Sequence, residues 1–231
     1  MIDLGSMHRV LSSAPCRGGL VKGWSILNHQ VAANPLVRRP GRSGKPAQLV
    51  DWSDPARYLG ARASDLDVKS PVVGLMTAVP MKRVVALRKE SKGIWVECFC
   101  TVGVTNAVKA GEPASYSGLE RRCRSAGTIN IILVTNAILS VPAMVGAVQV
   151  ATESKTAVLL ERAVTSWTGR HVATGTGTDT VVVACRLRSG PRLHYSGTHT
   201  IMGSLIGQVV DRCVRAGLVR AADGNQGASR Q

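Results

Sequence analysis

Gly127-Thr-Ile-Asn-Ile-Ile-Leu-Val-Thr-Asn-Ala137 is the stretch of this chain that does most to decide its fold. Its aliphatic, mostly β-branched run predicts a strand over 128–134. Asn130, Thr135 and Asn136 lie in or directly after that run. Polar groups beside a core cost free energy unless they are paired. Several of them together indicate a functional site rather than packing alone.

Two stretches further along the chain show the same mixture of apolar and polar residues. Ala151-Thr-Glu-Ser-Lys-Thr156 interrupts a pattern that predicts a long amphipathic helix over 142–164. Ala173-Thr-Gly-Thr-Gly-Thr-Asp179 alternates glycine with hydroxyls and leads into a strand predicted over 181–187. Its glycines would let a ligand approach backbone N–H groups closely. The alternative is a flexible turn closed by threonine–backbone hydrogen bonds. It is not a P-loop, because the lysine and the helix start are missing.

Upstream of the opening stretch, the sequence predicts short strands and one helix. Asp54-Pro55 is typical of a helix start, with a capping side chain before a proline at the first helical position. Turns at 79–81 and 90–93 would pair consecutive strands antiparallel. The predicted elements are a strand or two within 9–33, a loop over 34–48, a helix over 55–66, strands over 71–78, 82–88 and 93–102, and a loop over 109–126.

The order of these elements determines the expected fold class. Strands first, with helices mostly after them, favour α+β architecture over a doubly wound sheet. We expect a single domain, residues 1–220, with a mixed, largely antiparallel sheet and helices packed on it. A last helix over 199–216 would end at Gly217, and residues 221–231 would form a disordered tail.

Composition and charge narrow the classes of partner. Hydrophobic residues make up 45% of the 231, which is typical of a folded chain, whereas aromatic residues make up only 3%. The net charge of +15 would suit an anionic partner. However, the basic clusters Arg38-Arg39-Pro-Gly-Arg42 and Arg121-Arg122-Cys-Arg124 are short, separated and free of stacking aromatics. We therefore expect a solvated basic surface, no nucleic acid and no membrane partner.

The cysteines and the start of the chain predict compartment and metal content. Six cysteines are present, and Cys98-Phe-Cys100 is the one close pair, so no pair has the spacing of a structural zinc site. Buried thiols in a reducing cytoplasm are expected. The first residues lack the pattern of a signal peptide, and the apolar run over 129–150 is too interrupted for a membrane span. We expect no metal and no cofactor.

Three side chains are candidates for acid–base chemistry, and each has a structural alternative. Glu153 lies on the predicted long helix and could instead form a salt bridge. Asp179 could be a base, a metal ligand or an orienter of His199, or could accept backbone N–H bonds within its own turn. His199 would begin the last helix, where the helix dipole favours a neutral imidazole, or it could merely cap that helix.

Side-chain amides, hydroxyls and backbone N–H groups are the candidates for ligand binding. Asn106 and Asn130 could pair with amides of a ligand, or each could complete a hydrogen bond at a strand end or turn. The glycine-containing loop offers further groups for a substrate or an oxyanion. These are Thr174, Gly175, Thr176, Gly177 and Thr178.

The ordered set of motifs resembles the adenosylcobinamide amidohydrolase (CbiZ) family over roughly residues 10–217. No single motif is specific, but their order and spacing are. They are Arg17-Gly-Gly-Leu20, Asn28, Val73-Gly-Leu-Met-Thr-Ala78, Thr101-Val-Gly-Val-Thr-Asn-Ala107, Gly127-Thr-Ile-Asn130, Ala151-Thr-Glu-Ser-Lys-Thr156, Ala173-Thr-Gly-Thr-Gly-Thr-Asp179 and Ser196-Gly-Thr-His199.

The resemblance implies a function and a partner. Members of this family hydrolyse the amide that joins the corrin ring to the aminopropanol arm of adenosylcobinamide. The products are adenosylcobyric acid and (R)-1-amino-2-propanol, and the reaction salvages corrinoids for coenzyme B12 synthesis. The implied partner is a small-molecule corrinoid, whose cobalt belongs to the substrate. One alternative is a corrinoid-binding protein that has kept the fold without hydrolysis. Another is an acyl- or phosphoryl-transfer enzyme that uses the glycine-containing loop, although the sequence shows no motif for a nucleotide or acyl donor.

Overall fold

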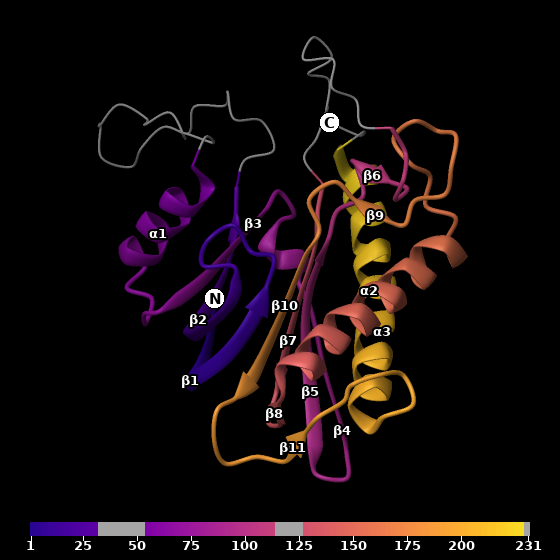
Figure 1. Cartoon of the computed structure of the whole chain (residues 1–231). Coiled ribbons are helices and arrows are strands. Elements are labelled where there is room, and N and C mark those ends of the chain that lie inside the picture. The colour runs from indigo at the N-terminus through magenta and orange to yellow at the C-terminus, as the bar shows by residue number, and fades with distance from the viewer. Residues whose placement is uncertain (32–53, 114–126, 229–231) are drawn as a thin grey trace.

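The structure is a computed structural model that describes residues 1–31, 54–113 and 127–228 (Figure 1). In chain order its elements are β1 (Ile2–Ser12), β2 (Gly19–Gln30), α1 (Pro55–Asp65), β3 (Val72–Thr77), a 3-10 turn η1 (Met81–Arg83), β4 (Val85–Ser91), β5 (Ile94–Val102), β6 (Ala107–Val108), β7 (Ile129–Thr135), β8 (Ile138–Leu139), α2 (Val141–Glu161), β9 (Gly175–Thr176), β10 (Thr180–Arg186), β11 (Arg192–Leu193) and α3 (Ile201–Ala228).

The main sheet has seven strands in the order β3-β2-β1-β10-β7-β5-β4. Four of its neighbouring pairs are antiparallel, namely β1–β2, β1–β10, β5–β7 and β4–β5. The pairs β10–β7 and β2–β3 are parallel. This mixed, largely antiparallel sheet with helices on it confirms the predicted α+β class.

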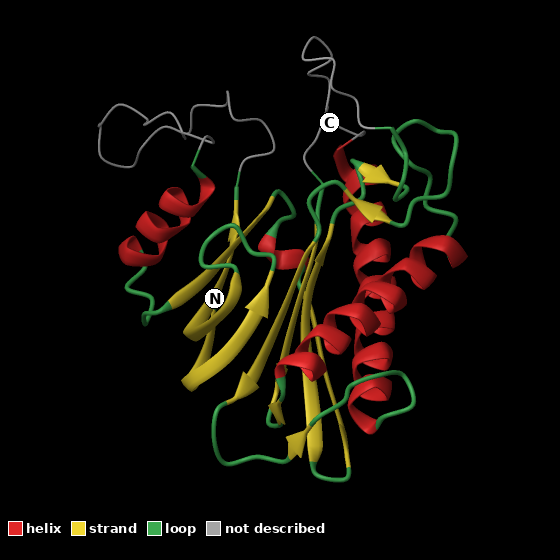
Figure 2. Cartoon of the chain, in the orientation of Figure 1, coloured by secondary structure: helices red, strands yellow, loops and turns green. Residues whose placement is uncertain are grey.

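The described helices lie on the outer face of a curved sheet, with α1 on one side of the molecule and α2 and α3 on the other (Figure 2). α2 and α3 cover β5, β7 and β10, where Leu133 and Val183 join Met144 and Ile206 in one apolar core. α1 packs on β2 and β3 at the other end of the same face.

The opposite face of the sheet is packed against itself. Val10, Ile26 and Val73, from β1, β2 and β3, form one buried cluster with Ile132 of β7 and Val182 of β10. This clustering requires the sheet to curl, so that its first three strands approach the face of β7. The curl brings β3 near β7, although three strands separate the two in the sheet order.

Several predicted elements are confirmed, with small shifts at their ends. The Asp54 side chain accepts a hydrogen bond from Arg57 N at 2.9 Å, and Pro55 is the first residue of α1. The hairpin β4–β5 turns at Lys92 and Gly93 as expected, and both residues have positive φ angles. Within the described residues, no helix is long and apolar enough to span a lipid bilayer.

Two predictions about the elements were wrong, and most of one strand was missed. The turn at 79–81 does not join neighbouring strands, because β3 and β4 lie at opposite edges of the sheet and η1 crosses between them. Most of β1 was not predicted, because the start of the chain has no regular apolar alternation. α3 does not end at Gly217 but continues to Ala228, so 221–228 of the predicted disordered tail are helical. The predicted loop over 34–48, and 114–126 of the next one, lie outside the described residues.

Candidate active site

Most of the predicted site residues meet at one end of the sheet. β7 and β10 run parallel, so Ile129 and Thr180 begin these neighbouring strands at the same end. Val102, the last residue of β5, pairs with Ile129 there. The loop that carries Thr174 to Asp179 precedes β10, and the turn that carries Asn106 follows β5. The topology therefore brings together segments that are far apart in the sequence.

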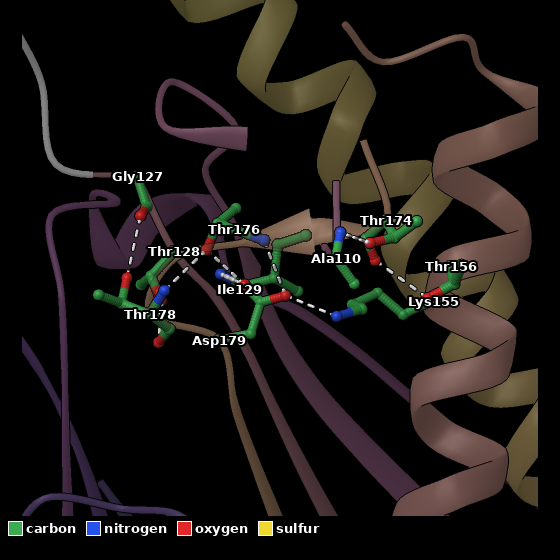
Figure 3. A network of polar contacts seen from close by, with 10 residues as sticks. All are labelled: Ala110, Gly127, Thr128, Ile129, Lys155, Thr156, Thr174, Thr176, Thr178 and Asp179. Atoms are coloured by element: carbon green, nitrogen blue, oxygen red, sulfur yellow. Dashed lines mark hydrogen bonds and ion pairs between the residues drawn. The ribbon is translucent and has the colours of Figure 1, made fainter. Parts of the chain in front are cut away.

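The Asp179 carboxylate is the centre of the polar network at this end (Figure 3). Its Oδ2 accepts from Lys155 Nζ at 2.6 Å and from Thr176 N at 3.0 Å. Its Oδ1 accepts from Ile129 N at 3.0 Å and from the Thr176 hydroxyl at 2.5 Å. Four donors thus hold the carboxylate in one position. It ties its own loop to the start of β7 and to α2.

Lys155 reaches Asp179 from the buried stripe of α2. This stripe contains Met144, Ala147, Ala151 and Val158, with Lys155 in the place of the next apolar residue. The side chains of Lys155 and Asp179 are only 8% and 15% exposed, so their ion pair is shielded from solvent. A buried ammonium needs such a partner.

Gly175 lies directly against this ion pair. A Cβ on Gly175 would stand 2.6 Å from Asp179 Oδ2 and 2.8 Å from Lys155 Nζ. Both separations are shorter than side-chain contacts allow, so a side chain at this position would have to displace the ion pair. In contrast, a Cβ on Gly177 would meet nothing within 4 Å. A close contact therefore constrains position 175, whereas position 177 has room for a side chain.

Threonine hydroxyls fix the rest of the loop. The Thr128 hydroxyl donates to Thr178 O at 2.7 Å, and the Thr178 hydroxyl donates to Gly127 O at 3.2 Å. On the other side, the Thr156 hydroxyl of α2 donates to Thr174 O at 3.0 Å. These are the threonine–backbone hydrogen bonds that the sequence analysis gave as the alternative to a ligand-binding role for the loop. They leave it ordered, with the exposed Gly177 at its tip.

Asn130 forms a polar clasp across the curled sheet. Its Nδ2 donates to Met76 O of β3 and to Asn28 Oδ1 of β2, both at 2.9 Å. Asn28 Nδ2 in turn donates to the Thr101 hydroxyl of β5 at 3.2 Å. The Oδ1 of Asn130 is buried and has no hydrogen-bond partner among the described residues. Because this oxygen has almost no accessible surface, an N–H or O–H group of a ligand could reach it only after its neighbours move.

Asn106 lies at the same end of the sheet, against Gly127. A Cβ on Gly127 would stand 2.9 Å from Asn106 Oδ1, which shows how closely the two segments approach. Asn106 Oδ1 is also buried without a hydrogen-bond partner in the part of the chain that the structure describes. Asn106 and Asn130, the two predicted amide-binding residues, therefore both keep an unused acceptor at this end.

The other two predicted catalytic side chains lie outside this network. Glu153 is exposed on α2, one turn before Thr156, and faces away from the buried Lys155. His199 is exposed in the loop before α3, and that loop packs on the start of α2, where the Ser140 hydroxyl donates to His194 O. The start of α2 is about 21 Å of helix from Lys155. The structure thus places Glu153 near the loop and does not bring His199 to it.

The Cys100 thiol beneath the network is a poor candidate for a nucleophile. Burial is the largest cause that raises the pKa of the Cys100 thiol, and Cys213 and Asp179 add to the rise while Lys155 opposes it. A buried thiol with a raised pKa is neutral and a poor nucleophile. Among the residues described, no three His, Cys, Asp or Glu side chains are grouped as metal ligands.

Sequence reasoning did not assign a role to several residues of this site. Lys155 was noted only as a polar interruption, although it occupies a buried position of the helical stripe. Asn28 was part of a motif without a role, and Thr101 is completely buried in β5. Lys155 could have been identified, because a polar residue at a core position of a periodic helix needs a buried partner.

The arrangement offers acceptors, hydroxyls and an exposed glycine loop beside a shielded ion pair. Buried amide oxygens suit a ligand with N–H donors, and the exposed Gly177 can bring a backbone N–H to a developing oxyanion. The fixed loop and the rigid α2 would preorganise these groups. Such a site suits the binding and cleavage of an amide.

Comparisons with known proteins agree with this description. The adenosylcobinamide amidohydrolase (CbiZ) family model matches residues 1–226. An adenosylcobinamide amidohydrolase from Methanosarcina mazei is 33% identical over 172 residues, which are 71% of this chain and 74% of that protein. An uncharacterized protein from Methanocaldococcus jannaschii is 34% identical over 166 residues, which are 66% of this chain and 64%, just under two thirds, of that protein. With a family model matched over almost its full length, the chain belongs to the adenosylcobinamide amidohydrolase family.

Proposed function

We propose that this protein hydrolyses the amide that joins the corrin ring to the aminopropanol arm of adenosylcobinamide. Family membership and the named Methanosarcina mazei relative support this reaction. The observation that carries the proposal is structural: Asn106 and Asn130 each keep a buried amide oxygen that has no donor among the described residues, at the end of the sheet where the family motifs meet. The products would be adenosylcobyric acid and (R)-1-amino-2-propanol, in cytoplasmic corrinoid salvage.

The unused oxygens are what an amide-rich substrate would require. A buried acceptor without a partner costs about 1–3 kcal/mol, and a ligand that supplies a donor recovers part of this cost. A corrinoid carries peripheral primary amides as well as the amide to be cleaved. Each of these groups has N–H donors that could pair with Asn106 Oδ1 or Asn130 Oδ1.

The reaction consumes one water per amide. The water oxygen would add to the amide carbonyl carbon while a base accepts its proton, and the negative charge would develop on the carbonyl oxygen. The N–H of Gly177 is a donor that could stabilise this charge. The C–N bond would then break, the carboxylic acid would stay on the ring, and the amine would take a proton as it leaves.

The structure suggests different roles for the three predicted catalytic residues. Asp179 has four donors on its carboxylate, which suits a positioning residue better than a free base. Glu153 is the exposed carboxylate one helical turn from the residue that binds the loop, so we propose it as the base. His199 is too distant to act at this end of the same chain.

Separate variants test these roles by the release of aminopropanol, alongside a melting curve. We expect Glu153→Gln to lower kcat by roughly two to four orders of magnitude with little change in the melting temperature. We expect Asp179→Asn to lower both kcat and stability, because it disturbs the loop. We expect His199→Ala to stay within about threefold of the parent, less than 1 kcal/mol. A fully active Glu153→Gln enzyme would exclude Glu153 as the base.

The decisive experiment is incubation of the purified protein with adenosylcobinamide. Adenosylcobyric acid and aminopropanol should appear in equal amounts, and treatment with EDTA should leave the rate unchanged, since we propose a metal-free reaction. Loss of activity on chelation, with recovery on addition of zinc, would contradict only the metal-free proposal. Binding of the corrinoid without any release of aminopropanol would instead establish a corrinoid-binding protein.

A further inference from the structure

A cavity of about 310 Å3 opens beside the polar network at the end of the curled sheet. Three separate parts of the chain form it: the turn between β1 and β2, the end of β3, and the start of β10. None of the predicted roles includes the first two. The lining residues are Ser13, Pro15, Met76, Thr178, Asp179 and Thr180.

Backbone hydrogen bonds hold the β1–β2 turn in place as a wall of the cavity. Cys16 and Gly74 exchange two such bonds, Cys16 N to Gly74 O at 3.2 Å and Gly74 N to Cys16 O at 3.0 Å. Ser13 N donates to Val181 O at 3.4 Å, which attaches the turn to β10 as well. The wall is thus fixed to strands on both sides, and the cavity is preformed.

The Asn130 clasp fixes the opposite wall. Asn130 Nδ2 donates to Met76 O, and Asn130 lies in register beside Thr180 in the parallel pair β7–β10. Two lining residues, Met76 and Thr180, are therefore direct neighbours of the side chain that keeps an unused buried oxygen. The cavity and the predicted amide-binding residue belong to one assembly.

The lining indicates the chemistry of the occupant. The surface of the cavity is mostly apolar, and Ser13, Thr178 and Thr180 carry hydroxyls at its edge. The Asp179 carboxylate also lines it but is already paired with Lys155. Among the described residues, no lysine or arginine lines the cavity. In a protein with a net charge of +15, this lining does not select an anion. It suits an uncharged group that combines a short carbon chain with hydroxyl and amide functions.

The volume limits which part of a corrinoid could enter. Pockets for drug-sized ligands run from about 300 to 1,000 Å3, and this cavity lies at the lower limit. A corrin ring with its amides and its adenosyl ligand is far larger than such a ligand. A short arm, in contrast, fits easily.

We infer that this cavity receives the aminopropanol arm of the substrate, while the corrin ring stays outside its mouth. The inference rests on the proposed function and deepens it, because it separates recognition of the arm from recognition of the ring. It also makes Ser13 and Thr180 specificity-determining residues.

Two corrinoids that differ only in the arm test this inference. Adenosylcobinamide carries the arm, whereas adenosylcobyric acid carries the ring alone. Ser13→Phe fills the cavity from an exposed position, and Ser91→Phe, in the distant β4–β5 hairpin, is the matched control. Dissociation constants for both ligands are measured by rapid mixing, before hydrolysis proceeds, and aminopropanol release is measured separately.

We expect Ser13→Phe to weaken adenosylcobinamide binding at least tenfold and to leave adenosylcobyric acid within twofold of the parent. Ser91→Phe should change neither. Equal weakening of both ligands, or no change in either, would overturn the inference. If Ser13→Phe does not fold, Thr180→Val, which removes a lining hydroxyl at constant shape, should weaken adenosylcobinamide selectively by roughly three- to tenfold.

The parent protein separates this inference from the proposed function. If it releases no aminopropanol, the proposed hydrolysis is wrong, and the ligand pattern above still decides whether the arm enters the cavity. If it binds neither corrinoid, both proposals fail. If it hydrolyses adenosylcobinamide but Ser13→Phe and Thr180→Val bind both ligands like the parent, only the cavity assignment fails.

Discussion

The Lys155–Asp179 ion pair is the residue contact on which the site depends most. Removal of one partner from a buried pair typically costs 3–5 kcal/mol, because the other charge is left without its counterion. Lys155→Met should therefore lower the free energy of unfolding by about 3 kcal/mol, the lower end of that range, since Asp179 keeps three other donors. Urea unfolding measures this change.

A double-mutant cycle checks that the loss comes from the pair. Asp179→Asn combined with Lys155→Met should cost less than the sum of the single changes, by at least about 1 kcal/mol. Lys22→Met, at an exposed position of β2, is the control and should change stability by less than about 0.5 kcal/mol. Additive single changes would show that the two side chains do not depend on each other.

Adding one methyl group at each glycine of the loop tests whether Gly175 is constrained by its contact with the ion pair. Gly175→Ala places a Cβ against both members of the ion pair, so we expect a loss of about 1–3 kcal/mol as the pair is pushed apart. Gly177→Ala meets nothing within 4 Å and should be neutral or slightly stabilising. Melting temperatures of the two variants compare them directly, and equal stability would contradict this account of Gly175.

At the scale of elements, Gly217 determines how closely α3 approaches β5. A Cβ on Gly217 would clash with Val102 Cγ2 and stand 2.8 Å from Val102 Cβ. Gly217→Ala should therefore cost about 1–3 kcal/mol, although alanine is the better helix former. Gly207→Ala, in the same helix with open space around it, should stabilise by about 0.5–1 kcal/mol. Thermal unfolding of both variants tests the pair, and a stabilising Gly217→Ala would contradict the close contact.

Gly217 also illustrates which elements the sequence could predict. Local signals were reliable: Asp54-Pro55 started α1, and the β-branched run at 128–134 became β7 with a shift of one residue. Gly217 looks like a helix stop in the sequence, but tertiary packing against Val102 requires it in mid-helix. Local chemistry cannot distinguish these two uses of glycine, because the deciding neighbour is more than 100 residues away.

The candidate site shows the same limit. Polar interruptions of apolar runs identified Asn130, Asp179 and the loop over 174–178 as residues that need partners. Which partners they have depends on strand order. The parallel register of β7 and β10 and the curl of the sheet brought Asn28 to Asn130, and neither feature has a signature in local spacing.

At the scale of the whole molecule, the Asn130 clasp joins β2 and β3 to β5 and β7 across the curled sheet. Asn28→Ala removes the bonds to Asn130 and to the Thr101 hydroxyl, so we expect a loss of about 1–3 kcal/mol. Amide exchange in β2 and β3 should accelerate more than exchange in α3. Hydrogen-exchange mass spectrometry measures this, with Gln149→Ala, exposed on α2, as the control. Uniform acceleration in all elements would indicate general destabilisation instead.

The place of β1 in the sheet has a consequence for synthesis of the chain. β1 pairs with β2 soon after both leave the ribosome, but its other edge pairs with β10, where His8 lies opposite Arg186. Most of the protein must therefore be translated before that edge is covered. Until then the nascent β1–β2 hairpin presents an unpaired strand, which is a template for wrong pairing with other chains. The chain should depend on chaperones most strongly in the interval before β10 emerges.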